Sequence, residues 1–340
     1  MPDVLDDAYE QLHTKGPEFG GWLSNHGPMA ADALLRLGRG DEVPGWVRGY
    51  AKRLEPMPGA RLPIAEAEWP DLLGDASRLG DWCGLLTQQV CDEPWEDVLA
   101  RWWPRLLPGA AAAAAHGLIR TGHAVRALRE AVTAPRLAEL GQALGYWAAR
   151  WQPVPRPAPT RGMADVGVAL DALPARDLTG GIRTRLASLA DDATWPASLA
   201  AVAPVADPLA VPAALDALVD AAVTRYGRWG QREPVMLVHA ATAPRAIALV
   251  LPALPEQLWP ASYEAAWMVT ATIATVYRPS SLATVAGERP VTIEEVVEGA
   301  VESGDEHAIK FTEVAVESHR RGSALALAAA AHAVKWIGAE

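Results

Sequence analysis

Histidines are the residues of this chain whose grouping best suits metal or acid–base chemistry. His116, Arg120 and His123 follow one another at the spacing i, i+4 and i+7, which places them on one face of a helix. Their neighbours are apolar, so we expect this face to be buried. A buried polar face must be satisfied by protein partners or by a metal ion. A hydrogen-bonded polar seam between helices is the alternative to a metal site.

A second group lies in residues 305–313, where His307 and Lys310 are three residues apart and share one side of a helix. An ordinary lysine is a poor metal ligand. A lysine of lowered pKa that has reacted with carbon dioxide carries a carbamate, which binds a metal as a long carboxylate would. The alternative is a surface lysine that pairs with Glu306 or Glu313.

The other histidines give weaker signals. His239 lies in the apolar segment 236–244 and is expected to be buried, whereas His26 lies in a turn that opens a helix. Either one could be a ligand or a structural histidine. The remaining three lack a second ligand type at helical spacing and are expected to be surface or structural residues: His13, His319 and His332.

Several cofactor and nucleophile motifs are absent from the sequence. It contains no glycine-rich dinucleotide-binding motif, no Walker loop, no His-Glu-x-x-His and no Gly-x-Ser-x-Gly. Flavin and NAD(P) are therefore not expected as cofactors. Two cysteines, Cys83 and Cys91, are too few for a disulfide framework or a cysteine zinc cluster.

The composition and charge of the chain limit the classes of protein to which it can belong. The 340 residues are 50% hydrophobic and 21% charged, which is sufficient for a packed core. The formal net charge of −11 argues against non-specific binding to nucleic acid or to an anionic membrane. The acidic start lacks the basic region of a signal peptide, and no run of 18 apolar residues occurs. We expect a globular cytoplasmic protein, with its oligomeric state open.

The elements that must position these residues are helical by their periodicity, so the sequence predicts an all-α fold. Helices are expected over 28–38, 109–133, 136–151, 208–223, 261–277 and, as one or two helices, 305–338. We expect a single domain over 1–340, because candidate site residues lie on both sides of the proline-rich stretch 152–160. That stretch is where a subdomain break would fall.

Charge is unevenly distributed along the chain. Residues 101–161 hold nine Arg and two acidic residues, whereas residues 286–320 hold nine acidic and three basic residues. Two complementary solvated faces that contact each other would explain this pattern. Alternatively, the basic stretch lines a site for an acidic or phenolate-bearing ligand.

Four histidine-containing motifs occur in order along the chain: Asn25-His26-Gly27-Pro28-Met29-Ala30-Ala31, residues 115–124, residues 237–242 and residues 305–310. In order and spacing they resemble the questin oxidase-like family of fungal and actinobacterial secondary metabolism, over essentially the whole chain. Fungal members tend to carry a second His and a Tyr in the middle motif, where this chain has Arg120 and His123.

The resemblance implies a flavin-independent oxidoreductase that cleaves a ring of an aromatic polyketide, as a dioxygenase or a Baeyer–Villiger-like monooxygenase with O₂ as co-substrate. It also implies a non-heme Fe²⁺ with an anionic oxygen ligand from a carboxylated lysine. The ligands carried over are His26, His116, His239, His307 and Lys310. Arg120 and His123 would hold a phenolate or carboxylate and shuttle protons.

Two other functions fit the same residues. Zn²⁺ or another Lewis acid in the same ligand set would give a hydrolase or lyase that opens a lactone or pyrone ring. A non-catalytic helical protein that binds a small molecule would use the histidines only as a hydrogen-bonded seam, and would contain no stoichiometric metal.

Overall fold

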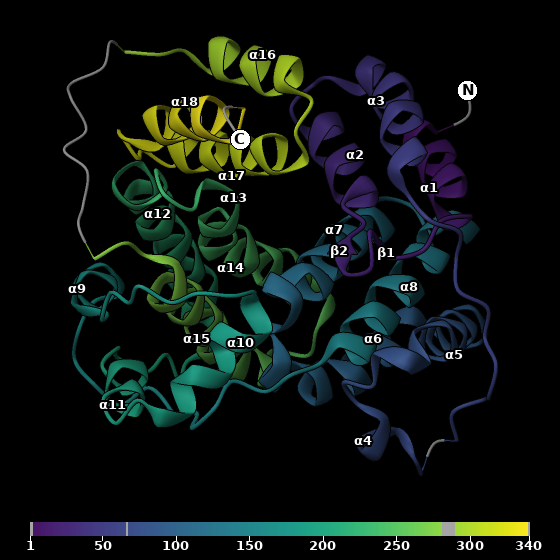
Figure 1. Cartoon of the computed structure of the whole chain (residues 1–340), viewed down its shortest axis with the longest axis horizontal. Coiled ribbons are helices and arrows are strands. Elements are labelled where there is room, and N and C mark those ends of the chain that lie inside the picture. The colour runs from purple at the N-terminus through teal and green to yellow at the C-terminus, as the bar shows by residue number, and fades with distance from the viewer. Residues whose placement is uncertain (1–2, 66, 281–289, 339–340) are drawn as a thin grey trace. The chain divides into compact units, whose positions relative to one another are not determined.

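The computed structural model describes residues 3–65, 67–280 and 290–338. Within these residues the regular structure is helical except for one pair of two-residue strands, so the all-α prediction is confirmed (Figure 1). The chain divides into two compact units, unit 1 (residues 1–153 and 249–255) and unit 2 (residues 154–248 and 256–340). The boundary after residue 153 falls inside the proline-rich stretch 152–160. The single domain over 1–340 stays a prediction.

Unit 1 is built from helices around one short hairpin. Its elements are α1 (Val4–His13), β1 (Glu18–Phe19), β2 (Leu23–Ser24), α2 (Gly27–Arg36), α3 (Val43–Tyr50), α4 (Trp69–Leu72), α5 (Leu79–Asp92), α6 (Trp95–Leu106), α7 (His116–Glu130) and α8 (Ala134–Arg150). Short 3₁₀ turns are η1 (Gly40–Glu42), η2 (Ala51–Arg53), η3 (Ala76–Arg78), η4 (Leu107–Gly109), η5 (Ala112–Ala115) and η8 (Leu251–Ala253).

Helix α8 is central to unit 1 and packs against α1, α5 and α7. The Thr133 side chain caps its start by accepting a hydrogen bond from a backbone N–H of the first turn. Its glycines let α5 approach closely, because a Cβ on Gly141 would lie 2.3 Å from the Cα of Thr87. A Cβ on Gly145 would lie 2.6 Å from the Cα of Cys83. Helix α7 also lies close to α8, because a Cβ on Gly117 would lie 2.5 Å from the Cβ of Trp147.

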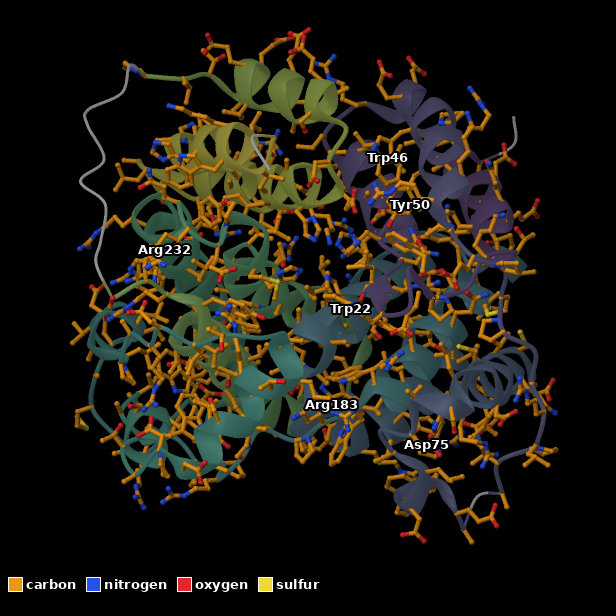
Figure 2. The ribbon with its side chains drawn as sticks, viewed as in Figure 1. Trp22, Trp46, Tyr50, Asp75, Arg183 and Arg232 are labelled. Atoms are coloured by element: carbon orange, nitrogen blue, oxygen red, sulfur yellow. The ribbon has the colours of Figure 1, made fainter. Side chains whose placement is uncertain are left out.

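The hairpin β1–β2 feeds directly into α2. The strands are antiparallel, with Glu18 opposite Ser24, and Gly20 and Gly21 take the positive φ angles of the turn. Trp22 follows this turn and is 68% exposed (Figure 2). Two residues after Ser24, the hairpin segment reaches the first residue of the candidate site.

Unit 2 consists of α9 (Val166–Ala172), α10 (Ile182–Ala187), η6 (Ser188–Asp191), α11 (Trp195–Ala200), η7 (Pro208–Ala210), α12 (Val211–Trp229), α13 (Pro234–Leu237), α14 (His239–Val250), η9 (Glu256–Leu258), α15 (Trp259–Tyr277), α16 (Ile293–Ser303), α17 (Glu306–Arg320) and α18 (Ala326–Ile337). The last two residues of α14 belong to unit 1. Helix α12 packs against α15, α17 and α18, and α17 packs extensively on α18.

One described segment, Pro234–Ala253, is long and apolar enough to cross a membrane by length and composition. Within its most apolar window, 78% of the residues are buried in the protein. The core helix of a globular protein gives the same pattern. This segment contains α13 and α14, and hence His239.

Most of the expected helices are present. The ranges 28–38, 136–151 and 261–277 correspond to α2, α8 and α15, and 305–338 contains two helices, α17 and α18, separated where Gly322 has a φ of +105°. The prediction of one helix over 109–133 is wrong, because α7 begins only at His116. Residues 113–115 have left-handed backbone angles, which end any regular helix despite the high helix propensity of alanine.

Candidate metal centre

Four buried histidines, His26, His116, His239 and His307, are the described side chains that could hold a metal ion. The first two belong to unit 1 and the other two to unit 2. All four were expected as ligands from the sequence.

In unit 1, His26 and His116 point their Nε2 atoms at each other, at a distance of 2.7 Å. His26 immediately precedes α2, and His116 is the first residue of α7. The backbone N–H of His26 donates to the Tyr50 hydroxyl at 2.8 Å, and Tyr50 in turn stacks on Trp46 (Figure 2). Two imidazole nitrogens at this distance share a proton: with the proton of His116 on Nδ1, the Nε2–H of His26 donates to Nε2 of His116.

The backbone before α7 determines which nitrogen of His116 carries the proton. The Nδ1–H of His116 donates to the carbonyl oxygen of Ala113 at 2.5 Å, and Ser24 Oγ also lies 2.9 Å from this nitrogen. With the proton on Nδ1, the lone pair is on Nε2, the atom that faces His26. The carbonyl reaches this position because residues 113–115 are left-handed, with φ of 46°, 56° and 64°. A left-handed backbone costs about 1–2 kcal/mol for each L-residue.

In unit 2, His239 and His307 form the second pair. Their rings lie 5.5 Å apart between centroids, and their nitrogens approach within 4.8 Å. The Nδ1–H of His239 donates to the carbonyl oxygen of Met236 at 3.0 Å, which places the imidazole lone pair on Nε2. Burial, together with His307 and Lys310, holds the pKa of His239 well below its ordinary value. His239 is therefore neutral at pH 7, the form that binds metals.

All four histidines lie at helix N-termini: His26 precedes α2, His116 and His239 open α7 and α14, and His307 is the second residue of α17. The partial positive charge of a helix N-terminus disfavours a protonated imidazole. It also favours an anion bound nearby. This placement therefore suits a ligand set that includes a negative oxygen.

Lys310 lies one turn beyond His307 on α17 and is 1% exposed. Its Nζ has no hydrogen-bond partner among the residues that the structure describes, and burial lowers its pKa to about 8, against the opposite effect of Glu306 and Asp305. The buried Thr242 hydroxyl, one turn beyond His239 on α14, is likewise without a hydrogen-bond partner in the described chain. Buried polar atoms are rarely left unsatisfied, so these two groups fit a site that holds an ion and an anionic ligand.

Arg120 is placed in a different environment from the histidine pair. Its Nε and Nη2 donate to the two carboxylate oxygens of Glu139 on α8, at 2.5 and 2.7 Å, and Nη2 also donates to Gln142. Both charged side chains are buried. Such a two-point buried ion pair is a structural contact between α7 and α8. The catalytic role of Arg120 stays a prediction that this geometry does not favour.

His123 has the geometry of an oriented acid–base group. Its Nδ1 donates to Asp32 on α2 at 2.8 Å, and no hydrogen bond to its Nε2 is found among the described residues. Asp32 is fully buried, and although burial raises its pKa, Arg126 and His123 hold it well below the ordinary value. His123 lies seven residues after His116, about 10 Å along the same helix.

The arginines of residues 101–161 are largely paired inside unit 1. Five of the nine form ion pairs with acidic side chains of the same unit, namely Arg101, Arg120, Arg126, Arg136 and Arg150. Fewer cations therefore remain for an acidic ligand than the composition of this stretch indicates.

The histidines not expected as ligands have other environments. His13 lies 3.1 Å from Glu139, and His332 stacks on Trp336 with ring centroids 4.6 Å apart. His319 is half-buried on α17. Sequence reasoning missed Ser24 and Tyr146, which surround His116, because a serine and a tyrosine 122 residues apart carry no spacing signal.

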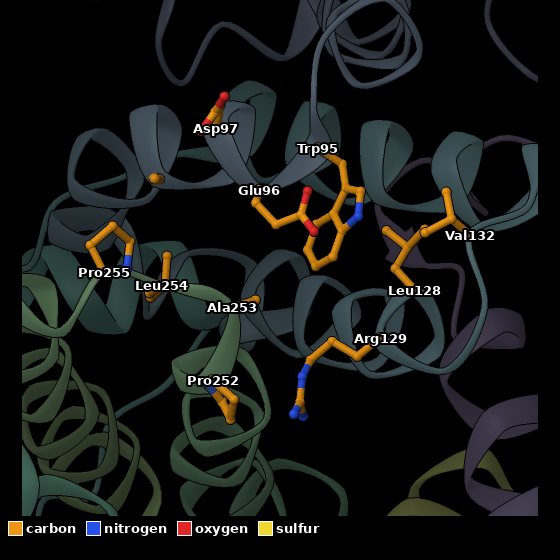
Figure 3. Close-up of a pocket in the computed structure, with 11 residues that line it drawn as sticks. Trp95, Glu96, Asp97, Leu128, Arg129, Val132, Pro252, Ala253, Leu254 and Pro255 are labelled. Atoms are coloured by element: carbon orange, nitrogen blue, oxygen red, sulfur yellow. The ribbon is translucent and has the colours of Figure 1, made fainter.

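Unit 1 also contains an open surface pocket of about 580 Å³ (Figure 3). Trp95, Leu128 and Arg129 line it together with the loop 252–255. None of the residues expected as metal ligands lines this pocket, so it is separate from the candidate metal centre.

No family model matches this chain, and no curated protein is significantly similar to it. The resemblance to the questin oxidase-like family therefore depends on the four motifs themselves. The site must be interpreted from its own chemistry.

Proposed function

We propose that this protein is a metal-dependent oxygenase in which His26, His116, His239 and His307 bind one Fe²⁺ ion. The observation that carries the proposal is the shared design of the two pairs. In each, one histidine is the first residue of a helix and donates its Nδ1–H to a backbone carbonyl three residues earlier in the chain, so the imidazole lone pair is on Nε2. Because a mononuclear site takes three or more protein ligands, two imidazoles alone would be an incomplete set.

Lys310 supplies the anionic ligand in this proposal. At a pKa of about 8, an appreciable fraction of the amine is unprotonated at neutral pH and can add to carbon dioxide. The resulting carbamate would bring a negative oxygen to imidazole ligands, a combination that suits non-heme iron. The Thr242 hydroxyl is available to donate a hydrogen bond to it.

The substrate class follows the family resemblance: an aromatic polyketide whose ring is cleaved with O₂. Bound iron would supply the activation of O₂. In the dioxygenase form both oxygen atoms enter the product, so the reaction balances without an external reductant. His123, oriented by Asp32, would exchange the proton of a phenol group on the substrate.

The first test is the metal content of protein purified without chelator. We expect about one iron per chain in the wild type and a loss of most of it in His239→Ala. His319→Ala is the matched control, since His319 lies on α17 with His307 but in a different environment. Oxygen uptake with hydroxylated anthraquinones then tests the oxygenase, and incorporation of two ¹⁸O atoms from ¹⁸O₂ identifies the dioxygenase form.

Two other outcomes would change the proposed function. Zinc at the same stoichiometry, lost in His239→Ala, supports the ligand set but changes the reaction to hydrolysis or elimination at a lactone or pyrone. Absence of metal in both proteins after anaerobic iron reconstitution contradicts the ligand assignment. The histidines would then be a polar seam of a non-catalytic binding protein.

A further inference from the structure

We propose that Ser24, Tyr146 and Glu18 form a hydrogen-bonded relay that positions His116 and strengthens it as a ligand. The inference rests on the proposed metal site and adds positioning residues to it. All four residues belong to unit 1, so the relay is defined within one compact unit.

The relay begins at the nitrogen of His116 that does not face His26. Ser24 Oγ lies 2.9 Å from His116 Nδ1 and 2.6 Å from the Tyr146 hydroxyl, and all three groups are buried. Glu18 interacts with the same Tyr146 hydroxyl. The hairpin explains this arrangement, because Glu18 and Ser24 are cross-strand partners of β1 and β2.

The donors can be ordered along the relay. The carboxylate of Glu18 only accepts, so the Tyr146 O–H donates to it. The Ser24 O–H then donates to the Tyr146 oxygen, and Ser24 Oγ accepts from His116 Nδ1–H, which it shares with the Ala113 carbonyl. Arg150 forms an ion pair with Glu18 and holds the carboxylate in place.

The direction of the relay has a chemical consequence. Hydrogen bonds that all point toward one negative charge polarise one another. Electron density is thereby drawn toward Nε2 of His116, as it is in metal sites where a carboxylate contacts the ligating histidine directly. Here the effect of Glu18 reaches the imidazole through two hydroxyl groups.

The test compares Tyr146→Phe with the wild type, using Co²⁺ as the probe metal. Removal of one hydroxyl separates Glu18 from Ser24 without changing the ring. We expect about tenfold weaker Co²⁺ affinity by chelator competition, together with a shift of the cobalt d–d absorption bands. Glu18→Gln keeps a hydrogen-bond acceptor but removes the negative charge. We therefore expect its Co²⁺ affinity to be lower than that of the wild type, by a smaller factor than in Tyr146→Phe.

Tyr263→Phe is the matched control, because Tyr263 is equally buried but lies on α15 of unit 2. Its Co²⁺ affinity and spectrum should equal those of the wild type. Equal affinity and spectrum in Tyr146→Phe and Tyr263→Phe would overturn the relay while leaving the metal site intact.

A second measurement needs no metal. In the metal-free protein, long-range ¹H–¹⁵N spectra should show His116 protonated at Nδ1 and unprotonated at Nε2, and Tyr146→Phe should shift the Nδ1 resonance. Failure of the wild type to bind Co²⁺ would count against the proposed function, whereas protonation of His116 at Nε2 would count against the relay.

Discussion

The two histidine pairs share a design but differ in their surroundings. In unit 1, His116 is linked through Ser24 and Tyr146 to Glu18, and the charged side chains nearby are paired with one another. In unit 2, the pair lies near the buried ammonium of Lys310, whose Nζ has no hydrogen-bond partner among the described residues. The same imidazole chemistry is therefore held in two different electrostatic environments.

This difference indicates a division of roles. A network of satisfied hydrogen bonds fixes the orientation of its members before any ligand arrives. An unpaired buried cation destabilises the fold until an anionic partner or a chemical modification removes its cost. We therefore interpret the pair in unit 1 as oriented by its protein partners, and the pair in unit 2 as lying beside a charge that a ligand or a modification of Lys310 would remove.

The largest expected effect comes from breaking a paired charge in unit 1. Asp32 accepts hydrogen bonds from His123, Arg36 and Arg126, so Asp32→Asn removes a fully buried negative charge that these three side chains share. We expect a loss of about 3–5 kcal/mol in the free energy of unfolding at pH 7. Urea unfolding measures it, and the exposed Asp71→Asn should change stability by less than about 0.5 kcal/mol.

The stability difference between the wild type and Asp32→Asn should depend on pH. The pKa of Asp32 is lower in the folded protein than its ordinary 3.8, so the unfolded state binds the extra proton first as the pH falls. Its stabilisation is complete above pH 3.8 and is lost as the pH drops further toward the folded pKa. The stability gap between wild type and Asp32→Asn should therefore narrow below pH 3.8. A constant gap would show that the carboxylate charge is not what stabilises unit 1.

Removal of a buried charge from unit 2 should increase the free energy of unfolding, whereas removal of Asp32 from unit 1 should decrease it. In metal-free, CO₂-free buffer, Lys310→Met replaces a buried ammonium, which has no hydrogen-bond partner among the described residues, by an apolar chain of similar length. We expect a gain of about 1–3 kcal/mol at pH 7, with Lys335→Met on the exposed face of α18 as the control. Metal content of the same variant should fall, since the proposed anionic ligand is gone.

The pH dependence of this gain follows from the lowered pKa. The folded protein releases the Lys310 proton near pH 8 and the unfolded chain near 10.5, so the cost of the ammonium is full below pH 8 and disappears above 10.5. The advantage of Lys310→Met should decline across this window. A loss of stability in the metal-free variant at pH 7 would mean that Lys310 already has a favourable partner.

Apolar periodicity predicted the helical framework, because it is a local signal. The set of four histidines came from the resemblance of the motifs to a known family, since residue spacing by itself left His26 and His239 open as ligands or structural residues. The sequence did not predict that Ser24 contacts His116 or that Tyr146 contacts Ser24, since both contacts arise only through tertiary packing. Arg120 and His123 looked equivalent on one helical face. Their roles separate only through the long-range partners Glu139 and Asp32, which no spacing on α7 reveals.

The sequence also did not predict the left-handed turn at residues 113–115. A run of six alanines at 110–115 is the strongest local helix signal in the chain, and it fails where the Ala113 carbonyl must reach His116. A local conflict of this kind, in which propensity and structure disagree, is typical of a functional position.

The smallest expected effect comes from Ala113→Gly, which tests whether the left-handed turn is under backbone strain. Unit 2 makes the equivalent contact between His239 and Met236 with a right-handed backbone at Val238, so only the contact in unit 1 requires left-handed residues. Ala113→Gly should relieve the turn and stabilise the metal-free protein by up to about 1 kcal/mol. Ala221→Gly, inside α12, should instead lose about 1 kcal/mol.

The same substitution should weaken metal binding slightly, because a glycine holds the carbonyl of residue 113 less firmly against His116. Opposite changes in the two quantities, measured by urea unfolding and by Co²⁺ competition, would identify the turn as a positioning device whose strain serves the ligand. If Ala113→Gly lowers both, the alanine methyl groups pack the turn and the strain has no separate role. Only opposite changes in stability and in Co²⁺ affinity would show that backbone strain in unit 1 serves to position His116.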